Sequence, residues 1–167
     1  KPLATLDINI TGGAGNVVAL DIPQIGKTGT TTAGVTGITR IGSTTATTVT
    51  MSDDLYNFGT GDVTISAVST GTGTTFSAAD TNVNTGGGAV TITGAVTGTR
   101  DLDILSGSGL ATITGNIGTG GTPLASLDIN ASNTAGHTGG VTLGGNIGTD
   151  SAAGSAVTTL GNPKTTG

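Results

Sequence analysis

Several residue types on which catalytic and nucleic-acid-binding sites depend are scarce or missing in this sequence. Its 167 residues contain no cysteine, tryptophan or glutamate, and only one histidine, two phenylalanines and one tyrosine. Without cysteine the chain has neither a disulfide nor a thiol nucleophile. Five cations and so few aromatic rings cannot form the basic patch and stacking platforms that phosphates and bases require. The sequence therefore predicts that nucleic acid is not a partner.

Long apolar runs and strong helix formers are also missing. No stretch approaches the roughly 18 consecutive apolar residues of a membrane-spanning helix, so we predict no membrane span. Glycine and threonine are abundant instead, with 32 and 37 residues. Glycine disfavours helices, and the β-branched threonine favours strands. We therefore expect an all-β chain with almost no helix.

The stretch from Val90 to Asn130 shows the pattern that the chain repeats. A Val-Thr-Ile-Thr-Gly phrase alternates with a Leu-Asp-Ile phrase, and each phrase alternates apolar with polar residues before a break. This period of two is typical of short strands that have one apolar face and are joined by tight turns. Residues 51–58, which contain the only methionine and the only tyrosine, depart from the repeat. We expect an elaborated turn or a lateral bump there.

The spacing of the phrases distinguishes two all-β architectures. Their central threonines, Thr64, Thr91, Thr112 and Thr142, are separated by 27, 21 and 30 residues. Steps of roughly 20 to 30 residues indicate a solenoid. The competing architecture, a β-sandwich, also has short strands at regular spacing, but the sequences of its strands rarely repeat one another. We predict a single β-solenoid domain over residues 1–167, a parallel β-helix of about six coils.

In such a coil the apolar residues of each phrase point inward and stack on their equivalents in the neighbouring coils. The aspartates and threonines between them point outward, including Asp7, Asp103 and Asp128. The predicted core comprises Val63, Ile65, Val90, Ile92, Ile113, Leu127, Ile129, Val141 and Leu143.

The two ends of the sequence resemble an interior stretch when they are joined. Residues 157–167 followed by residues 1–9 match residues 111–130 at twelve of 20 positions. Shared glycine and threonine explain part of this match, but an ordered Pro-Leu-Ala and Leu-Asp-Ile-Asn run supplies seven of the twelve identities. We predict that the domain is one period of a longer tandem array, or that separate copies stack head to tail into a filament. Other copies of the chain are thus the predicted partner.

The amino-acid sequence of residues 90–130 resembles the β-strand repeats of giant bacterial surface proteins of the filamentous haemagglutinin-like and autotransporter-adhesin type. The resemblance is good over residues 62–160 and loose over the first sixty. It implies a right-handed parallel β-helix, secretion to the cell exterior, and a role as a stalk, adhesin or matrix fibre.

The sequence does not predict a catalytic site. His137, the only histidine, lies among glycine and threonine residues that are typical of a turn. The pairs Asp53/Asp54 and Asp101/Asp103 carry the carboxylates that glycoside hydrolysis uses. Neither pair is accompanied by both a basic residue and an aromatic subsite, so we expect a protein that is not an enzyme.

Calcium is the one cofactor that the sequence brings into consideration. Asp62 lies in a Gly-Thr-Gly-Asp stretch that resembles a calcium-binding β-roll repeat but lacks its full spacing and does not recur. Asp103 and Asp128 are expected one coil apart, where a shared cation would offset their repulsion. Asp62, Asp103 and Asp128 are therefore the calcium candidates, and plain solvated aspartates are the alternative.

We predict an extracellular structural repeat at the cell surface that forms a fibre, stalk or adhesin by head-to-tail continuation. The alternative is a binding module with ice or a host or surface glycan as its ligand. Paired outward threonines would match a water lattice, although Leu143 and Leu160 interrupt the threonine ladder. An aromatic-lined groove near Tyr56, Phe58 and Phe76 would favour a glycan.

Overall fold

Every regular element of the described chain is a short strand. The structure, a computed structural model, describes residues 1–8, 20–22, 25–26, 34–42, 48–51, 55–69, 80–118, 124–130, 138–147 and 157–160. Fifteen strands lie within these ranges, and no helix does. All of their pairings are parallel. The predicted all-β class is confirmed, and the strands that connect into sheets are far apart in the sequence.

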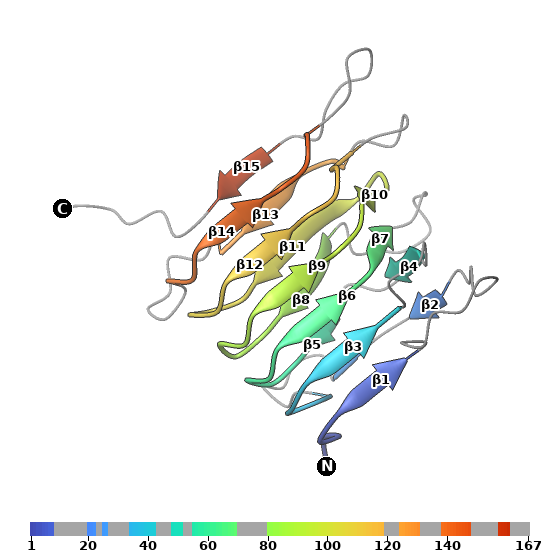
Figure 1. Cartoon of the computed structure of the whole chain (residues 1–167), viewed down its shortest axis with the longest axis vertical. Helices are drawn as coiled ribbons and strands as arrows, with labels where there is room; N and C mark the ends of the chain where they lie inside the picture. The colour runs from blue at the N-terminus through green and yellow to red at the C-terminus, as the bar shows by residue number, and fades with distance from the viewer. Residues whose placement is uncertain are drawn as a thin grey trace.

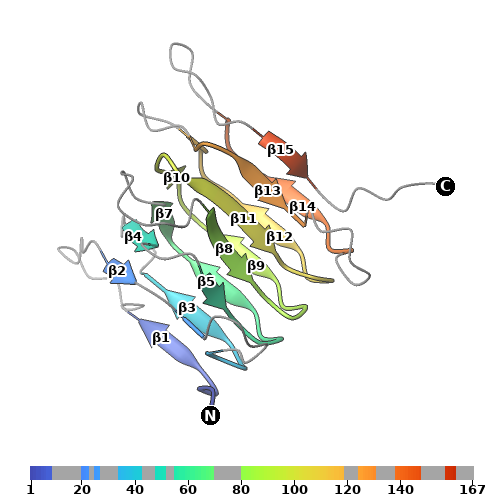
Figure 2. The same cartoon turned by 180° about the vertical axis from the view of Figure 1, so that it is seen from behind.

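The strands form three sheets, seen from two sides in Figures 1 and 2. The six-stranded sheet contains, in spatial order, β1 (Leu6–Ile8), β3 (Thr39–Ile41), β6 (Val63–Ile65), β9 (Val90–Ile92), β12 (Ala111–Ile113) and β14 (Val141–Leu143). The five-stranded sheet contains β5 (Leu55–Asn57), β8 (Asp80–Asn84), β11 (Asp101–Leu105), β13 (Leu127–Ile129) and β15 (Val157–Leu160). The four-stranded sheet contains β2 (Leu20–Ile22), β4 (Thr48–Met51), β7 (Ala67–Ser69) and β10 (Val96–Thr97).

The chain visits the three sheets in a fixed order. From β6 on the six-stranded sheet it passes to β7 on the four-stranded sheet, then to β8 on the five-stranded sheet, and it returns at β9. We call one such passage a circuit. Where a circuit lacks a named strand, a single bridging residue takes its place: Ile25 pairs with Tyr56, Ile117 with Val96, and Ile147 with Ile117. The described strands and bridges thus belong to six successive circuits.

The register of the six-stranded sheet follows the repeat in the sequence. Thr64 pairs with Thr91, Thr91 with Thr112, and Thr112 with Thr142. These are the four threonines whose spacing of 27, 21 and 30 residues indicated successive coils. The central residues of the phrases therefore lie in one row, a strand spacing of about 4.8 Å apart.

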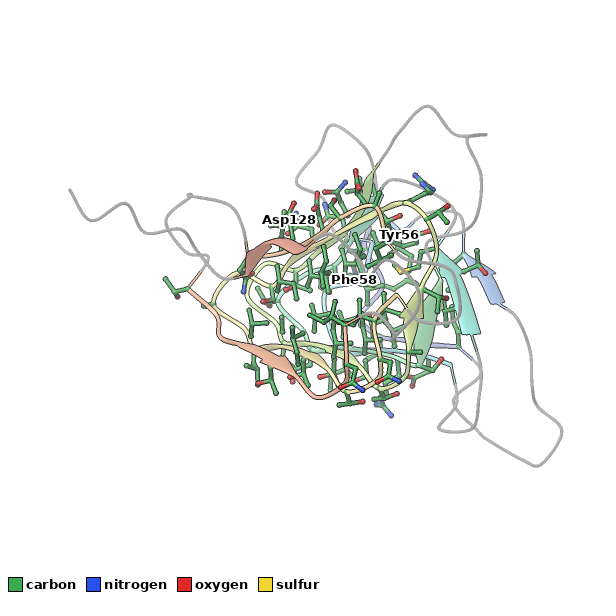
Figure 3. The ribbon with its side chains drawn as sticks, turned by 90° about the horizontal axis from the view of Figure 1, so that it is seen from above. Tyr56, Phe58 and Asp128 are labelled. Atoms are coloured by element: carbon green, nitrogen blue, oxygen red, sulfur yellow. The ribbon has the colours of Figure 1, made fainter. Side chains whose placement is uncertain are left out.

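Between the sheets lies one continuous apolar core. Because side chains alternate along a strand, the first and third residues of each three-residue phrase point inward and stack on those of the next circuit. Figure 3, seen from above, shows side chains filling the space that the strands enclose, with Phe58 among them. Of the nine predicted core residues, Val141 and Leu143 on the outer strand β14 are half-buried. The others are at most 1% exposed: Val63, Ile65, Val90, Ile92, Ile113, Leu127 and Ile129.

The interpretation of residues 51–58 as a turn or lateral bump is wrong in its described part. Met51 ends β4, Leu55–Asn57 forms β5, and Phe58 continues the pairing as a bridge to Val35. Met51, Tyr56 and Phe58 are at most 2% exposed. Large side chains fill the core at this level, and the tyrosine hydroxyl donates a hydrogen bond to the Ile22 carbonyl oxygen. Burial of the tyrosine is tolerated because its hydroxyl has this partner.

Candidate interaction surfaces

The outer face of the five-stranded sheet brings two of the three calcium candidates together. Asp103 of β11 pairs in register with Asp128 of β13, and Asn82 of β8 lies on the other side of Asp103. All three side chains are half-buried, and Asp128 is on the outer side of the ribbon in Figure 3. Parallel strands hold the two carboxylates about 4.8 Å apart at their backbones, a separation at which like charges repel. A cation beside this pair would offset that repulsion.

Asp62 lies elsewhere, on the six-stranded side of the molecule. It precedes β6 on the six-stranded sheet, is exposed, and accepts a hydrogen bond through Oδ1 from the backbone N–H of Ala89, at 3.0 Å. Its carboxylate therefore fixes the start of the next circuit. Among the described residues, no group of three or more His, Cys, Asp or Glu side chains is arranged to hold a metal ion. The three candidates do not form a common site, and calcium binding stays a prediction.

Asp7, which we expected to be equivalent to Asp103 and Asp128, occupies a different sheet. It lies on β1 of the six-stranded sheet and faces outward, and its Oδ1 is 3.4 Å from Nε of Arg40 on β3. Both side chains are about half exposed, at 40% and 50%, so water screens this ion pair and it contributes little to stability. The outward direction was predicted correctly, but the partner is a cation of the same chain.

The outer face of the six-stranded sheet carries the threonine row. Thr64, Thr91 and Thr112 are half-buried and Thr142 is exposed, all on adjacent strands. The interruption expected at Leu143 is not in this row, because Leu143 pairs with Ile113 on the inward side. Leu160 is on β15 of the five-stranded sheet.

A second, shorter row lies beside the first. Thr93 and Thr114 are exposed, and the Thr114 hydroxyl donates to the Thr93 carbonyl oxygen at 2.8 Å. The next circuit has Gly144 at the corresponding point, since its N–H bonds Ile113 as that of Thr114 bonds Ile92. The double row therefore extends over two circuits only.

Two of the three aromatic residues expected to line a glycan-binding groove are buried. Tyr56 is fully buried and Phe58 is 2% exposed, so neither ring can stack on a sugar at the surface. Phe76 lies outside the described residues, as do His137, Asp53 and Asp54. Asp101 and Asp103 are two residues apart on β11, half-buried on the same outward face.

The two outer strands of the six-stranded sheet leave apolar side chains partly exposed. Leu6 and Ile8 on β1, and Val141 and Leu143 on β14, are half-buried, whereas their equivalents on the inner strands are buried. Bridging residues show the same contrast. Leu3 is 54% exposed beside Val35 at 1%, and Ile147 is 41% exposed beside Ile117, which is fully buried. Sequence reasoning missed Leu3 and Ile147, because each belongs to a bridge rather than to a repeated phrase.

Comparison with known proteins identifies no relative. No family model matches the chain, and neither a curated protein nor a solved structure matches it. Within the described ranges, no helix has the length and apolar character needed to cross a membrane. What the chain does must therefore be argued from its own surfaces and from the pattern of its sequence.

Proposed function

We propose that the chain is a right-handed parallel β-solenoid that serves as an extracellular structural repeat. In this proposal it adds length to a fibre, stalk or adhesin at a cell surface and catalyses no reaction. The observation that carries the proposal is the repetition of one contact. Along the six-stranded sheet the same in-register parallel pairing occurs five times between successive circuits, while the apolar side chains of both outer strands are only half-buried. Such a stack is stabilised when a further circuit is added at either end.

The path of the chain supports the right-handed sense. In Figure 1 the strands of the six-stranded sheet run toward the upper right, and the chain then turns through β7 and β10 to the sheet behind. Figure 2 shows that rear sheet from its own side, with β5, β8 and β11 running in the opposite direction. Successive circuits move from the N-terminus toward β14 and β15. A path of this kind winds as a right-handed screw.

The proposed place outside the cell depends on the resemblance of residues 62–160 to the repeats of bacterial surface proteins. Copies of the same domain, joined in one chain or stacked head to tail, are the proposed partner. A tandem array and a filament of separate copies use the same contact between β14 and β1.

A covalent tandem of two copies tests this contact. Joining Gly167 of one copy to Lys1 of the next leaves residues 161–167 and 1–5, twelve in all, between β15 and β1. Eleven residues, 130–140, separate β13 from β14, the same step between sheets. We expect the tandem to melt at a higher temperature than the single chain. Hydrogen exchange should show new protection in β14 of the first copy and β1 of the second.

A matched tandem with Leu6→Lys and Ile8→Lys in its second copy is the control, because charges at these inward positions prevent the stacking. It should melt at the temperature of the single chain. The proposal is wrong if the parent tandem also melts as two independent copies and its outer strands exchange as fast as in the single chain.

Ice binding is a second candidate, favoured by the uninterrupted row from Thr64 to Thr142. Regularly spaced hydroxyl and methyl groups on a parallel sheet would order water at the strand repeat of about 4.8 Å. Measurement of ice growth in the presence of the parent and of Thr91→Lys/Thr112→Lys tests it. The parent should retard growth and the variant should not, whereas Asp128→Lys, on the opposite sheet, should behave as the parent does. Unretarded growth with the parent excludes this function.

A further inference from the structure

A column of glycines lies at the corner where the chain passes from the five-stranded to the six-stranded sheet. A Cβ on any of them would come closer than 3.0 Å to the backbone of the preceding member, a separation that real Cβ atoms essentially never show. The members are Gly37, Gly61, Gly88, Gly109 and Gly139, and Gly37 lies against Ala4 in the same way. The obstacle is a backbone carbonyl group each time, which cannot move aside as a flexible side chain could. A circuit that follows another circuit therefore needs glycine at this corner.

Ala4 occupies the same corner in the first circuit. Its side chain is exposed, and the neighbouring Leu3 is 54% exposed. Each glycine of the column would direct a Cβ toward the circuit before it. By the same geometry the methyl group of Ala4 points away from Gly37, toward the side from which a preceding circuit would approach.

The other end of the stack presents the complementary surface. Gly139 is the last described member of the column, and in the same circuit Val141, Leu143 and Ile147 are partly exposed. If a second copy docks here with the spacing found inside the chain, its Ala4 methyl meets the carbonyl group of Gly139. In the contacts inside the chain at this corner, the residue that faces the carbonyl group is a glycine and carries only a hydrogen atom there. A docked Ala4 would place a methyl group at that point.

We infer that the end face formed by β14, Gly139 and Ile147 fits a circuit with glycine at this corner, and that Ala4 weakens the stacking of a second copy on it. The inference depends on the proposed function, because it assumes that circuits continue beyond β14. Its basis is the coil-to-coil contact already formed within the chain, repeated with one extra methyl group. Adding a methyl group to a close-packed contact forces the backbones apart, so separate copies associate less tightly than their shape would otherwise allow.

Sedimentation equilibrium of the full chain with different residues at position 4 tests the inference. We expect Ala4→Gly to associate at least about tenfold more tightly than the parent, and Ala4→Val at least about tenfold less tightly. Ala125→Gly is the matched control, because Ala125 is exposed and lies outside the column. It should associate as the parent does. At low concentration Ala4→Val should melt with the parent, since the side chain of Ala4 makes no buried contact. Ala4→Gly and Ala125→Gly should melt together slightly below it, because glycine restricts the unfolded chain less than alanine does.

A further variant locates the contact. Leu143→Lys, combined with Ala4→Gly, should abolish association, because it places a charge on the face that receives the second copy. Equal association constants for the parent, Ala4→Gly and Ala4→Val would overturn the role of Ala4 and leave the proposed function standing. Association that persists in the Leu143→Lys background would place the contact elsewhere and also overturn the inference. The tandem protein described above tests the proposed function separately, because its two copies are linked covalently.

Discussion

Asp103 and Asp128 lie in register on the neighbouring parallel strands β11 and β13, and both face outward. Two carboxylates in this arrangement repel each other, whereas the equivalent outward position of β8 holds the neutral Asn82. Repulsion between these two carboxylates is therefore an electrostatic cost in the five-stranded sheet, and a cation or a neutral substitution would relieve it.

The first prediction follows from that repulsion. Asp128→Asn should stabilise the fold by about 0.2–1 kcal/mol at low ionic strength, and the gain should decrease as salt is added. Calcium should raise the melting temperature of the parent but not that of the variant. Asp7→Asn is the control. It should destabilise the fold slightly rather than stabilise it, because it removes the ion pair with Arg40. Equal melting of the parent with calcium and with a chelator would show that Asp103 and Asp128 do not bind calcium.

The second prediction concerns the inward row of the six-stranded sheet. Ile92 is fully buried between Ile65 and Ile113, its partners in the adjacent circuits. Ile92→Asp should destabilise the chain by about 4 kcal/mol or more, since no partner is available for a charge at that depth. Thr91→Asp, one residue away on the outward face, should cost less than about 1 kcal/mol. Chemical denaturation measures both, and similar costs for the two variants would contradict the assignment of faces.

A third prediction concerns two buried threonines. In the described part of the chain, the hydroxyls of Thr39 and Thr81 are buried without a hydrogen-bond partner. Thr39 lies between Leu6 and Val63, and Thr81 pairs with Leu102, so both hydroxyls are in apolar surroundings. Valine has the same shape without the polar atom. Thr39→Val and Thr81→Val should therefore each stabilise the fold by about 1–2 kcal/mol.

Thr85 provides the control for this pair. It is 2% exposed, but its hydroxyl donates to the carbonyl oxygen of Gly88 at 2.7 Å. Thr85→Val should destabilise the fold by about 1 kcal/mol or more. If Thr81→Val were as harmful as Thr85→Val in thermal melting, the hydroxyl of Thr81 would have a partner in solution.

The sequence predicted which side of each strand is buried better than it predicted which sheet the strand joins. Alternation within each phrase decided which residues point inward, and the register of Thr64, Thr91, Thr112 and Thr142 followed from their spacing. The Leu-Asp-Ile phrase shows where this reasoning stops. Leu6–Ile8 lies on the six-stranded sheet, Leu20–Ile22 on the four-stranded sheet and Leu127–Ile129 on the five-stranded sheet. The same three residues fit any strand that has one buried face. The geometry of the corners, and not the sequence of the phrase, therefore decides which sheet the strand joins.

Two features of the surfaces could not be predicted from local patterns. Burial of Tyr56 depends on a hydrogen bond to Ile22, 34 residues away in the sequence. The column that ends at Ala4 depends on backbone contacts between circuits, and glycine is so frequent here that its members do not stand out. Both features arise from contacts between segments that are distant in sequence.

The last prediction concerns Asn130, which is fully buried and has a left-handed backbone with φ of 51°. Its Oδ1 accepts from the backbone N–H of Ser106 at 2.9 Å, and its Nδ2 donates to Ser106 Oγ at 2.9 Å and to the Gly139 carbonyl oxygen at 3.1 Å. The side chain thus joins the corner between β13 and β14 to the stacked corner between β11 and β12. Both Asn130→Gly and Asn130→Ala lose these bonds and leave the buried N–H of Ser106 unpaired, which costs about 1–3 kcal/mol.

Only glycine accepts the left-handed backbone without strain, so Asn130→Ala should be less stable than Asn130→Gly by a further 1 kcal/mol or so. Asn116 offers the matched comparison. It is exposed, and its Oδ1 accepts from the N–H of Asn146 at 3.0 Å, but its φ is not positive. There the order should reverse, with Asn116→Ala at least as stable as Asn116→Gly, because alanine restricts the unfolded chain more than glycine does. Denaturant titration of the four variants measures both differences, and the same order at both positions would show that the left-handed backbone of Asn130 has no effect on stability.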